Sequence, residues 1–245
     1  MTEYANAQSV EADCKAATVK IADLESKLKD WANLSRYREA NEKDALKPGD
    51  GTRVVFIGDS ITDGWALDQY FSGKAYINRG ISGQTTPQML IRFRSDVINL
   101  RPKAVVILAG TNDIAGNTGR MSLDDTSRNM ISMVELAKAN NIQVVLSSVL
   151  PVNDRMKNKE GALLVQTKSR PNENIIAMNT WLRKYAADNN LIYLDYYSAM
   201  VNKDDSLTDG ISYDGLHPNA DGYKIMQVLA EEAISRSLRK QQNKR

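Results

Sequence analysis

The sequence has little of the two residue types that most often mark special chemistry. It contains one cysteine, Cys14, and one histidine, His217. A single cysteine excludes an intrachain disulfide framework, and no neighbouring cysteine or histidine could complete a zinc site with Cys14. We therefore expect no metal and no cofactor. If an imidazole serves as a general base in this protein, it must belong to His217.

Long apolar segments are also missing. No stretch approaches the roughly 20 apolar residues of a membrane span, and Met1–Asn6 lacks the basic and apolar regions of a signal peptide. We expect no membrane span, a cytoplasmic protein as the chain stands, and a periplasmic or secreted one if a signal was removed. The 32 basic and 30 acidic residues nearly balance, which argues against nucleic acid as a partner.

The N-terminal part of the chain is predicted to be a helical extension, residues 1–49, ahead of a globular domain, residues 50–245. One long helix is expected over residues 8–41, and Pro48-Gly49-Asp50-Gly51 breaks the pattern. Apolar or small residues recur there at heptad spacing, at Val10, Cys14, Ala17, Ile21, Leu24, Leu28 and Trp31. The short seam favours a helix docked on its own domain over a coiled coil. Both a monomer and a homodimer paired through this helix stay open.

After the boundary, apolar runs alternate with helical patterns. Continuous runs such as Val105-Val106-Ile107-Leu108 indicate strands buried on both faces, and the alternation indicates right-handed crossovers. The chain therefore predicts a three-layer α/β/α sandwich with a mainly parallel five-stranded sheet. The expected strands are Arg53–Ile57, Tyr76–Arg79, Ala104–Ala109, Gln143–Ser148 and Ile192–Asp195. The expected helices are Thr86–Asn99, Leu123–Asn140, Asn174–Asn189 and Ile225–Leu238, the last introduced by residues 220–223.

Unusual polar clusters follow the predicted strands. They are Gly58-Asp59-Ser60, Asn78-Arg79-Gly80-Ile81-Ser82-Gly83, Gly110-Thr111-Asn112-Asp113, and Asp214-Gly215-Leu216-His217-Pro218 before the last helix. Each cluster alone is explained as well by a helix cap or a turn. Parallel strands, however, end at one edge of a sheet, where ligands bind. Serine, histidine and aspartate meeting there would supply a nucleophile, its base and the group that orients the base.

Together these clusters resemble the conserved blocks of the GDSL or SGNH family of ester hydrolases, over roughly residues 50–235. The resemblance implies a flavodoxin-like SGNH hydrolase fold and a catalytic domain at residues 50–245. It also implies Ser60 as the nucleophile, with Asp214 and His217 completing the triad. Ser60, Gly83 and Asn112 would form the oxyanion hole. The residues within these motifs are most similar to those of the bacterial branch of platelet-activating-factor acetylhydrolase-like and carbohydrate acetylesterase enzymes.

The implied activity is hydrolysis of short-acyl esters, with acetyl esters favoured, and the implied partner is a small-molecule or carbohydrate ester. Asp59, Arg155 and Arg170 are candidate substrate-binding residues. The segment Pro151–Pro171 is rich in lysine and arginine and is expected to border the pocket. A long-acyl binder would want a more apolar groove there. A solvated loop without a role in specificity explains the segment equally well.

Two alternatives remain for the function. One is a lysophospholipase or thioesterase with a longer acyl preference. The other is a carbohydrate-binding protein on the same fold without turnover, because fold does not imply function. A binding protein without turnover is disfavoured, because the motif positions still hold Ser60, His217 and Asp214. Asp59, Asp63 and Asp113 could invite a divalent ion, but we expect them to support their own loops through hydrogen bonds.

Overall fold

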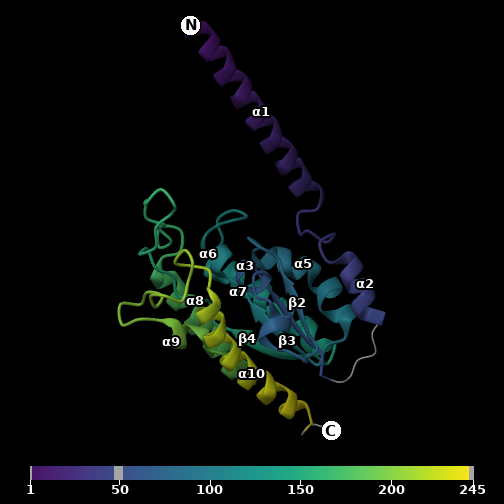
Figure 1. The fold of residues 1–245 in the computed structure, drawn as a ribbon. Coiled ribbons are helices and arrows are strands. Elements are labelled where there is room, and N and C mark those ends of the chain that lie inside the picture. The colour runs from purple at the N-terminus through teal and green to yellow at the C-terminus, as the bar shows by residue number, and fades with distance from the viewer. Residues whose placement is uncertain (1, 47–51, 243–245) are drawn as a thin grey trace.

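Five parallel strands form the central sheet, in the order β2-β1-β3-β4-β5. The computed structural model describes residues 2–46 and 52–242, leaving out the side chains of residues 2–12, 23, 26, 27, 241 and 242. The strands are β1 (Val54–Gly58), β2 (Tyr76–Gly80), β3 (Ala104–Leu108), β4 (Gln143–Ser147) and β5 (Ile192–Leu194). Each predicted strand boundary lies at or next to the observed one. The predicted three-layer sandwich is confirmed (Figure 1).

Helices cover both faces of this sheet because alternate strand residues point to opposite sides. Val55 and Ile57 of β1 belong to one apolar cluster, and Val54 and Phe56 belong to the other. The first face is covered by α5 (Thr86–Asp96), the short η1 (Ile98–Leu100), α7 (Leu123–Ala139) and α8 (Asn172–Asp188). The second is covered by α3 (Ser60–Asp63), α4 (Leu67–Tyr70), α9 (Tyr196–Met200) and α10 (Ala220–Gln242).

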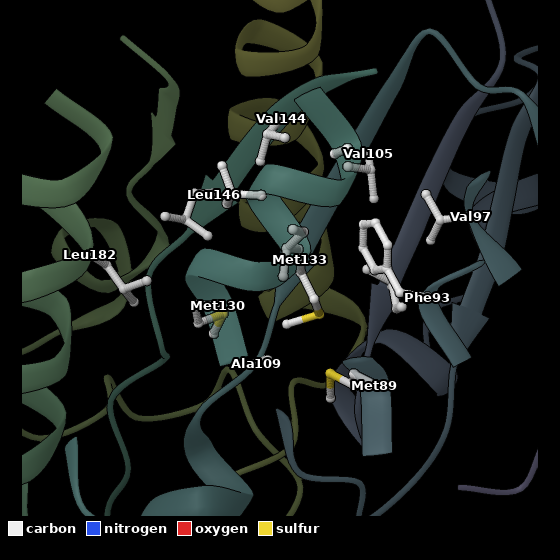
Figure 2. Packing of buried hydrophobic residues seen from close by; sticks show 14 of the residues in the cluster. Met89, Phe93, Val97, Val105, Ala109, Met130, Met133, Val144, Leu146 and Leu182 are labelled. Carbon is white, nitrogen blue, oxygen red and sulfur yellow. The ribbon is translucent and has the colours of Figure 1, made fainter. Parts of the chain in front are cut away.

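Figure 2 shows the packing on the first face, where Phe93 of α5, Met133 of α7 and Val105 of β3 meet in one buried cluster. All three side chains are fully buried. Within the described part of the chain, none of the helices is both long and apolar enough for a membrane crossing.

The N-terminal helix differs from the prediction in two ways. The expected single helix over residues 8–41 is two helices, α1 (Thr2–Lys29) and α2 (Arg38–Leu46). The chain turns at Asp30, whose carboxylate accepts the backbone N–H groups of Leu34 and Ser35 at 2.7 and 2.9 Å. Asn33 completes the turn with a φ of 52°. Competition of an Asp side chain for backbone N–H groups is a known cause of helix ends.

The expected docking of the long helix is wrong for most of α1, which projects away from the sandwich (Figure 1). Its seam residues Ile21 and Leu28 are exposed. Pairing of α1 with a second copy stays a prediction. The predicted boundary at Pro48–Gly51 lies outside the described residues, and the division at residues 49 and 50 stays a prediction.

By contrast, the turn after α1 and the helix α2 are bound to the sandwich. Arg79, at the end of β2, pairs with Asp44 at 2.8 Å and donates to the side-chain oxygen of Asn41 at 2.8 Å. The hydroxyl of Tyr37 donates to the carbonyl oxygen of Gly80. The extension is therefore anchored on the strand that carries the second polar cluster.

A buried arginine joins the carboxyl ends of two strands. The guanidinium of Arg92, on α5, donates to the carbonyl oxygens of Gly58 and Arg79 at 2.9 and 2.7 Å. It also donates to Gln84 Oε1 at 2.5 Å and pairs with Asp96 at 2.9 Å. Arg92 is fully buried. These bonds fix the end of β1 relative to the end of β2, and with it the segment that leads into Ser60.

We expect Arg92→Met to lower the free energy of unfolding by about 3–5 kcal/mol, because it leaves Asp96 buried without its cationic partner. Urea unfolding at neutral pH measures this change. The matched control is Arg128→Met, which removes an (i, i+4) pair with Asp124 whose side chains are 68% and 78% exposed. An exposed pair is worth less than about 1 kcal/mol. Equal losses in the two variants would contradict a structural role for Arg92.

Candidate active site

The polar clusters that follow β1, β2 and β3 meet at one edge of the sheet. The strand order changes direction between β1 and β3, and such a point is where open parallel sheets bind ligands. Ser60 opens α3 directly after β1. A Cβ atom on Gly80 would lie 2.1 Å from the backbone nitrogen of Asp63. The turn that carries Ser60 can therefore lie against the end of β2 only because residue 80 has no side chain.

Ser60, His217 and Asp214 form a hydrogen-bonded chain. Ser60 Oγ lies 2.9 Å from His217 Nε2, although the two residues are 157 positions apart in the sequence. His217 Nδ1 lies 2.7 Å from Asp214 Oδ2. The other carboxylate oxygen, Asp214 Oδ1, accepts the backbone N–H groups of Leu216 and His217 at 3.0 and 2.8 Å. One short loop thus holds the acid and the imidazole together.

The ionisation of Asp214 decides the tautomer of the ring. Burial would raise the pKa of Asp214, but hydrogen bonds from the His217 ring and from the backbone N–H groups of His217 and Leu216 outweigh it and lower the pKa to about 2. Asp214 is then an ionised acceptor at neutral pH, so Nδ1 of a neutral His217 carries the proton. Nε2 is left with a free lone pair facing the Ser60 hydroxyl, as a general base requires.

Contacts with Asn153 and Gln166 hold the loop of Asp214 and His217 in place. Gly215 has a φ of 82°, and a Cβ atom there would lie 2.1 Å from the carbonyl oxygen of Asn153. Asn153 donates its backbone N–H to the Gly215 carbonyl oxygen at 2.9 Å. Gln166 Nε2 donates to the carbonyl oxygen of Asp214 at 2.9 Å. The segment Pro151–Pro171 therefore supports the acid–base loop directly, a contact that sequence reasoning did not foresee.

Gly83 lies in the loop after β2, and Asn112 lies after β3 and contacts that loop. Gly83 has a φ of 78°, which favours glycine, and it is exposed. Asn112 is buried and donates one amide hydrogen to the carbonyl oxygen of Gln84 at 3.0 Å. Asn117 Nδ2 donates to the carbonyl oxygen of Gly83 at 3.1 Å. The structure thus brings these two predicted residues to neighbouring positions on the edge that carries Ser60.

Arg170 and Arg155 were expected to bind substrate, and their contacts indicate other roles. Arg170 is only 9% exposed; it donates to Asn112 Oδ1 at 3.2 Å and to Thr111 Oγ1 at 3.1 Å. It therefore lies behind Asn112 and is not free for substrate. The guanidinium of Arg155 pairs with Asp209 at 2.6 Å and Asp204 at 3.4 Å. Its charge is neutralised within the protein.

Asp59 was also expected to bind substrate, but it is 0% exposed and cannot reach a ligand. Asp59 Oδ1 accepts the backbone N–H of Ile61 at 3.0 Å, and Oδ2 has no hydrogen-bond partner in the described part of the chain. Burial raises the pKa of Asp59 to about 7, against the opposing effects of the Ile61 hydrogen bond and the nearby His217 and Arg170. Asp59 is therefore a buried carboxyl group that is partly protonated at neutral pH.

Asp63 and Asp113 support loops. Asp63 accepts the backbone N–H of Ser82 at 3.1 Å and the Ser82 hydroxyl at 2.6 Å. Asp113 accepts the backbone N–H of Thr86 at 3.0 Å and its hydroxyl at 2.5 Å. Asp63 thereby joins the segment after β1 to the loop after β2, and Asp113 joins the segment after β3 to the start of α5.

Sequence reasoning missed Arg92 and Gln84, which tie these loops together. Gln84 accepts from Arg92, receives the amide of Asn112 at its carbonyl oxygen, and donates to the carbonyl oxygen of Ala32 at 2.7 Å. A sequence signal existed for Arg92, because it lies among Met89 and Phe93 on the apolar face of its helix. A charged residue on an apolar face is buried only when it has partners.

Several hollows lie along this edge. Ser60 and His217 line an open one of about 480 Å³, whose walls include Gly64, Ser82, Tyr213, Pro218 and Tyr223. A larger one of about 720 Å³ lies between α7 and α8, with Leu123 among its lining residues. Ser60, Asp214 and His217 do not line the larger hollow. The chemistry is therefore assigned to the smaller one.

Comparisons with known proteins agree with this geometry. A family model, the GDSL-like Lipase/Acylhydrolase family, matches residues 56–225. Among solved structures, the chain is 42% identical to a GDSL-like lipase from Bacteroides thetaiotaomicron VPI-5482. The two superpose with a TM-score of 0.75, over 84% of this chain and 98% of that one.

Curated relatives match shorter stretches. The chain is 30% identical to an uncharacterised lipoprotein, YqeF, of Bacillus subtilis strain 168, over 40% of this chain and 49% of the relative. It is 32% identical to an acetylxylan esterase of Geobacillus stearothermophilus, over 28% of this chain and 43% of the relative. The chain thus covers less than half the length of these two relatives.

The buried carboxyl group of Asp59 gives a prediction for stability against pH. The pKa of Asp59 is raised to about 7 in the folded protein, from about 3.9 in an unfolded chain. Its protonated form therefore stabilises the fold fully below about pH 4, and this contribution is lost as pH rises to about 7. Asp59→Asn removes the titration. Between pH 4 and pH 7 the free energy of unfolding of Asp59→Asn should rise relative to that of the wild type. Above pH 7 the difference between the two should stay constant.

Asp154→Asn is the control of opposite sign. Asp154 accepts hydrogen bonds from Gln166 and Thr167, and although burial opposes them, its pKa is lowered. The Asp154 carboxylate therefore contributes to the free energy of unfolding above the pKa that it has in the unfolded chain, and this contribution is lost as pH falls. Asp154→Asn should accordingly be less stable than the wild type at neutral pH. Urea unfolding at several pH values measures both variants. A difference between Asp59→Asn and wild type that does not change with pH would refute the prediction.

Proposed function

The chain belongs to the GDSL-like lipase/acylhydrolase family, and we propose that the chain cleaves short-acyl esters by way of an acyl-enzyme. The matched region is a carboxylic ester hydrolase domain. Ser60 is the nucleophile, His217 the general base and Asp214 the group that orients it. The observation that carries this proposal is the chain of contacts from Ser60 Oγ to His217 Nε2 at 2.9 Å and from His217 Nδ1 to Asp214 Oδ2 at 2.7 Å.

The proposed reaction proceeds in two steps. His217 Nε2 accepts the hydroxyl proton as Ser60 Oγ attacks the ester carbonyl carbon, and the imidazolium then gives that proton to the departing alkoxide. Water, deprotonated by the same nitrogen, attacks the acyl-enzyme, and the carboxylic acid leaves as Ser60 regains its proton. Asp214 is ionised because its pKa is low, and its negative charge favours the imidazolium that forms in both steps.

The oxyanion of each tetrahedral intermediate would be bound by the backbone N–H groups of Ser60 and Gly83 and by the side-chain amide of Asn112. Arg170 supports the third donor. Because Arg170 holds Asn112 Oδ1, the Nδ2 end of the amide is directed the other way. One of its hydrogens is bound to the carbonyl oxygen of Gln84, and we assign the second to the oxyanion. Donors fixed before the reaction need no reorganisation when charge develops.

A short acyl group, acetyl in particular, is the proposed substrate portion. The hollow around Ser60 is small and bounded by Tyr213, Pro218 and Tyr223. A similar protein, from Geobacillus stearothermophilus, is an acetylxylan esterase. An ester of a carbohydrate is accordingly the substrate class that we propose. A longer acyl preference, as in a lysophospholipase or thioesterase, is the alternative.

Ser60→Ala should lower kcat for nitrophenyl acetate at least about 10⁴-fold, because the nucleophile is lost. The matched control is Ser72→Ala, since Ser72 is an exposed serine in the turn between α4 and β2 that does not line this hollow. It should keep most of the wild-type rate. Near-normal hydrolysis by a folded Ser60→Ala variant would exclude Ser60 as the nucleophile. The same assay with nitrophenyl octanoate decides between short and long acyl preference, through the ratio of kcat/KM values.

Arg170→Met should lower kcat about 10- to 100-fold with little change in KM, because a donor that acts in the transition state loses its position. Arg155→Met is the control. It removes another arginine of the Pro151–Pro171 segment, but one bound to Asp204 and Asp209. Thermal unfolding should be recorded for both variants. If Arg170→Met raised KM alone, Arg170 would be a substrate contact after all.

A further inference from the structure

The turn after α1 borders the loop that carries Gly83 and forms a second hollow beside the catalytic one. This second hollow, which we call the Trp31 subsite, has a volume of about 620 Å³. It is lined from the N-terminal side by Leu28 and Trp31, and from the domain by Ser82, Gly83, Gln88 and Asn117. Ser82 lines the catalytic hollow as well. The two hollows are therefore neighbours, with the proposed oxyanion residue Gly83 in the wall of the second.

Hydrogen bonds hold the N-terminal wall in place. Gln88 Nε2 donates to the carbonyl oxygen of Trp31 at 2.6 Å, and Gln84 Nε2 donates to that of Ala32 at 2.7 Å. The turn itself is closed by Asp30. Trp31 nevertheless remains 41% exposed. A fixed backbone that presents a large aromatic ring to solvent loses little further entropy when a ligand binds.

The geometry of an ester allows one of its two arms to reach this subsite. With the carbonyl carbon at Ser60 Oγ and the carbonyl oxygen near Gly83, the acyl and alkoxy groups extend in different directions. A short acyl group needs only a small part of the catalytic hollow. The larger space beyond Gly83 is then available to the alcohol.

We propose that the Trp31 subsite binds the alcohol part of the substrate, and that this alcohol is a neutral saccharide. The proposal rests on the ester hydrolase function proposed above. A sugar ring has an apolar C–H face, which suits the indole of Trp31. It also has hydroxyl groups, which suit Asn117 and Thr118: beyond its bond to Gly83 or Thr85, an amide or a hydroxyl group can still accept or donate another hydrogen bond. Asp30 lines the same hollow, and although burial opposes the hydrogen bonds from Ser35 and Leu34, its pKa is lowered. An ionised Asp30 disfavours an anionic alcohol.

Steady-state kinetics of Trp31→Ala test this proposal with two acetyl esters. For an acetylated xylo-oligosaccharide, KM should rise about tenfold, which corresponds to about 1.4 kcal/mol of lost binding. For ethyl acetate, whose alcohol is too small to fill the subsite, kcat/KM should stay within about twofold of wild type. Trp31→Phe keeps an aromatic face and should restore most of the affinity for the oligosaccharide.

Leu123→Ala is the matched control, because Leu123 is 40% exposed and lines the large hollow between α7 and α8. A rise in KM with Leu123→Ala and none with Trp31→Ala would place the saccharide there and overturn the proposal. Equal losses on both esters would make Trp31 a structural residue. A loss confined to nitrophenyl octanoate would make the subsite an acyl groove. If the wild type cleaved nitrophenyl acetate but no acetylated saccharide, the subsite and the carbohydrate substrate class would be wrong, while the esterase function would stand. If it cleaved neither, the proposed function itself would fail.

Discussion

The buried guanidinium of Arg92 is the interaction on which the arrangement of the catalytic edge depends. A buried carbonyl without a partner is costly, and strand ends often take their partners from outside the sheet. Arg92 donates to the carbonyl oxygen of Arg79 and to that of Gly58, which also accepts the backbone N–H of Ile81, and its charge is balanced by Asp96. The same side chain fixes Gln84, so the turn before Ser60 and the loop around Gly83 share one anchor. Any shift of α5 would move both together.

The proposed catalytic groups fall into two classes that are positioned by different means. Ser60, Gly83 and Asn112 come from the ends of three strands, so their relative positions follow from sheet register and from the bonds of Arg92 and Gln84. Asp214 and His217 are instead neighbours in one turn that Asp214 closes with its own carboxylate. A local turn can be rigid without long-range support. Only its placement against Ser60 depends on the rest of the fold, through Gly215, Asn153 and Gln166.

The sheet and the site residues could be predicted because each left a local pattern, an apolar run or a short motif at its end. The roles of Arg170 and Asp59 could not, because a sequence shows a charge but not whether it is buried. Arg170 lies in a lysine- and arginine-rich segment, where an exposed loop is the ordinary expectation; burial behind Asn112 depends on how that loop folds back. The break after α1 was missed for a related reason. Asp30 fits a helical pattern as well as it fits a cap, and the heptad spacing continues through it.

The charge near the proposed oxyanion hole depends on two buried groups, Arg170 and Asp59. From the sequence alone, their opposite charges would be expected to cancel. Arg170 is cationic at all working pH values, whereas burial keeps Asp59 partly protonated up to about pH 7. At lower pH the positive charge behind Asn112 is therefore not balanced by Asp59, which favours a developing oxyanion. At higher pH, Asp59 ionises and opposes that charge, while favouring the imidazolium of His217. Ionised Asp59 would therefore oppose the proposed oxyanion and favour the proposed imidazolium, and burial limits the fraction of Asp59 that is ionised.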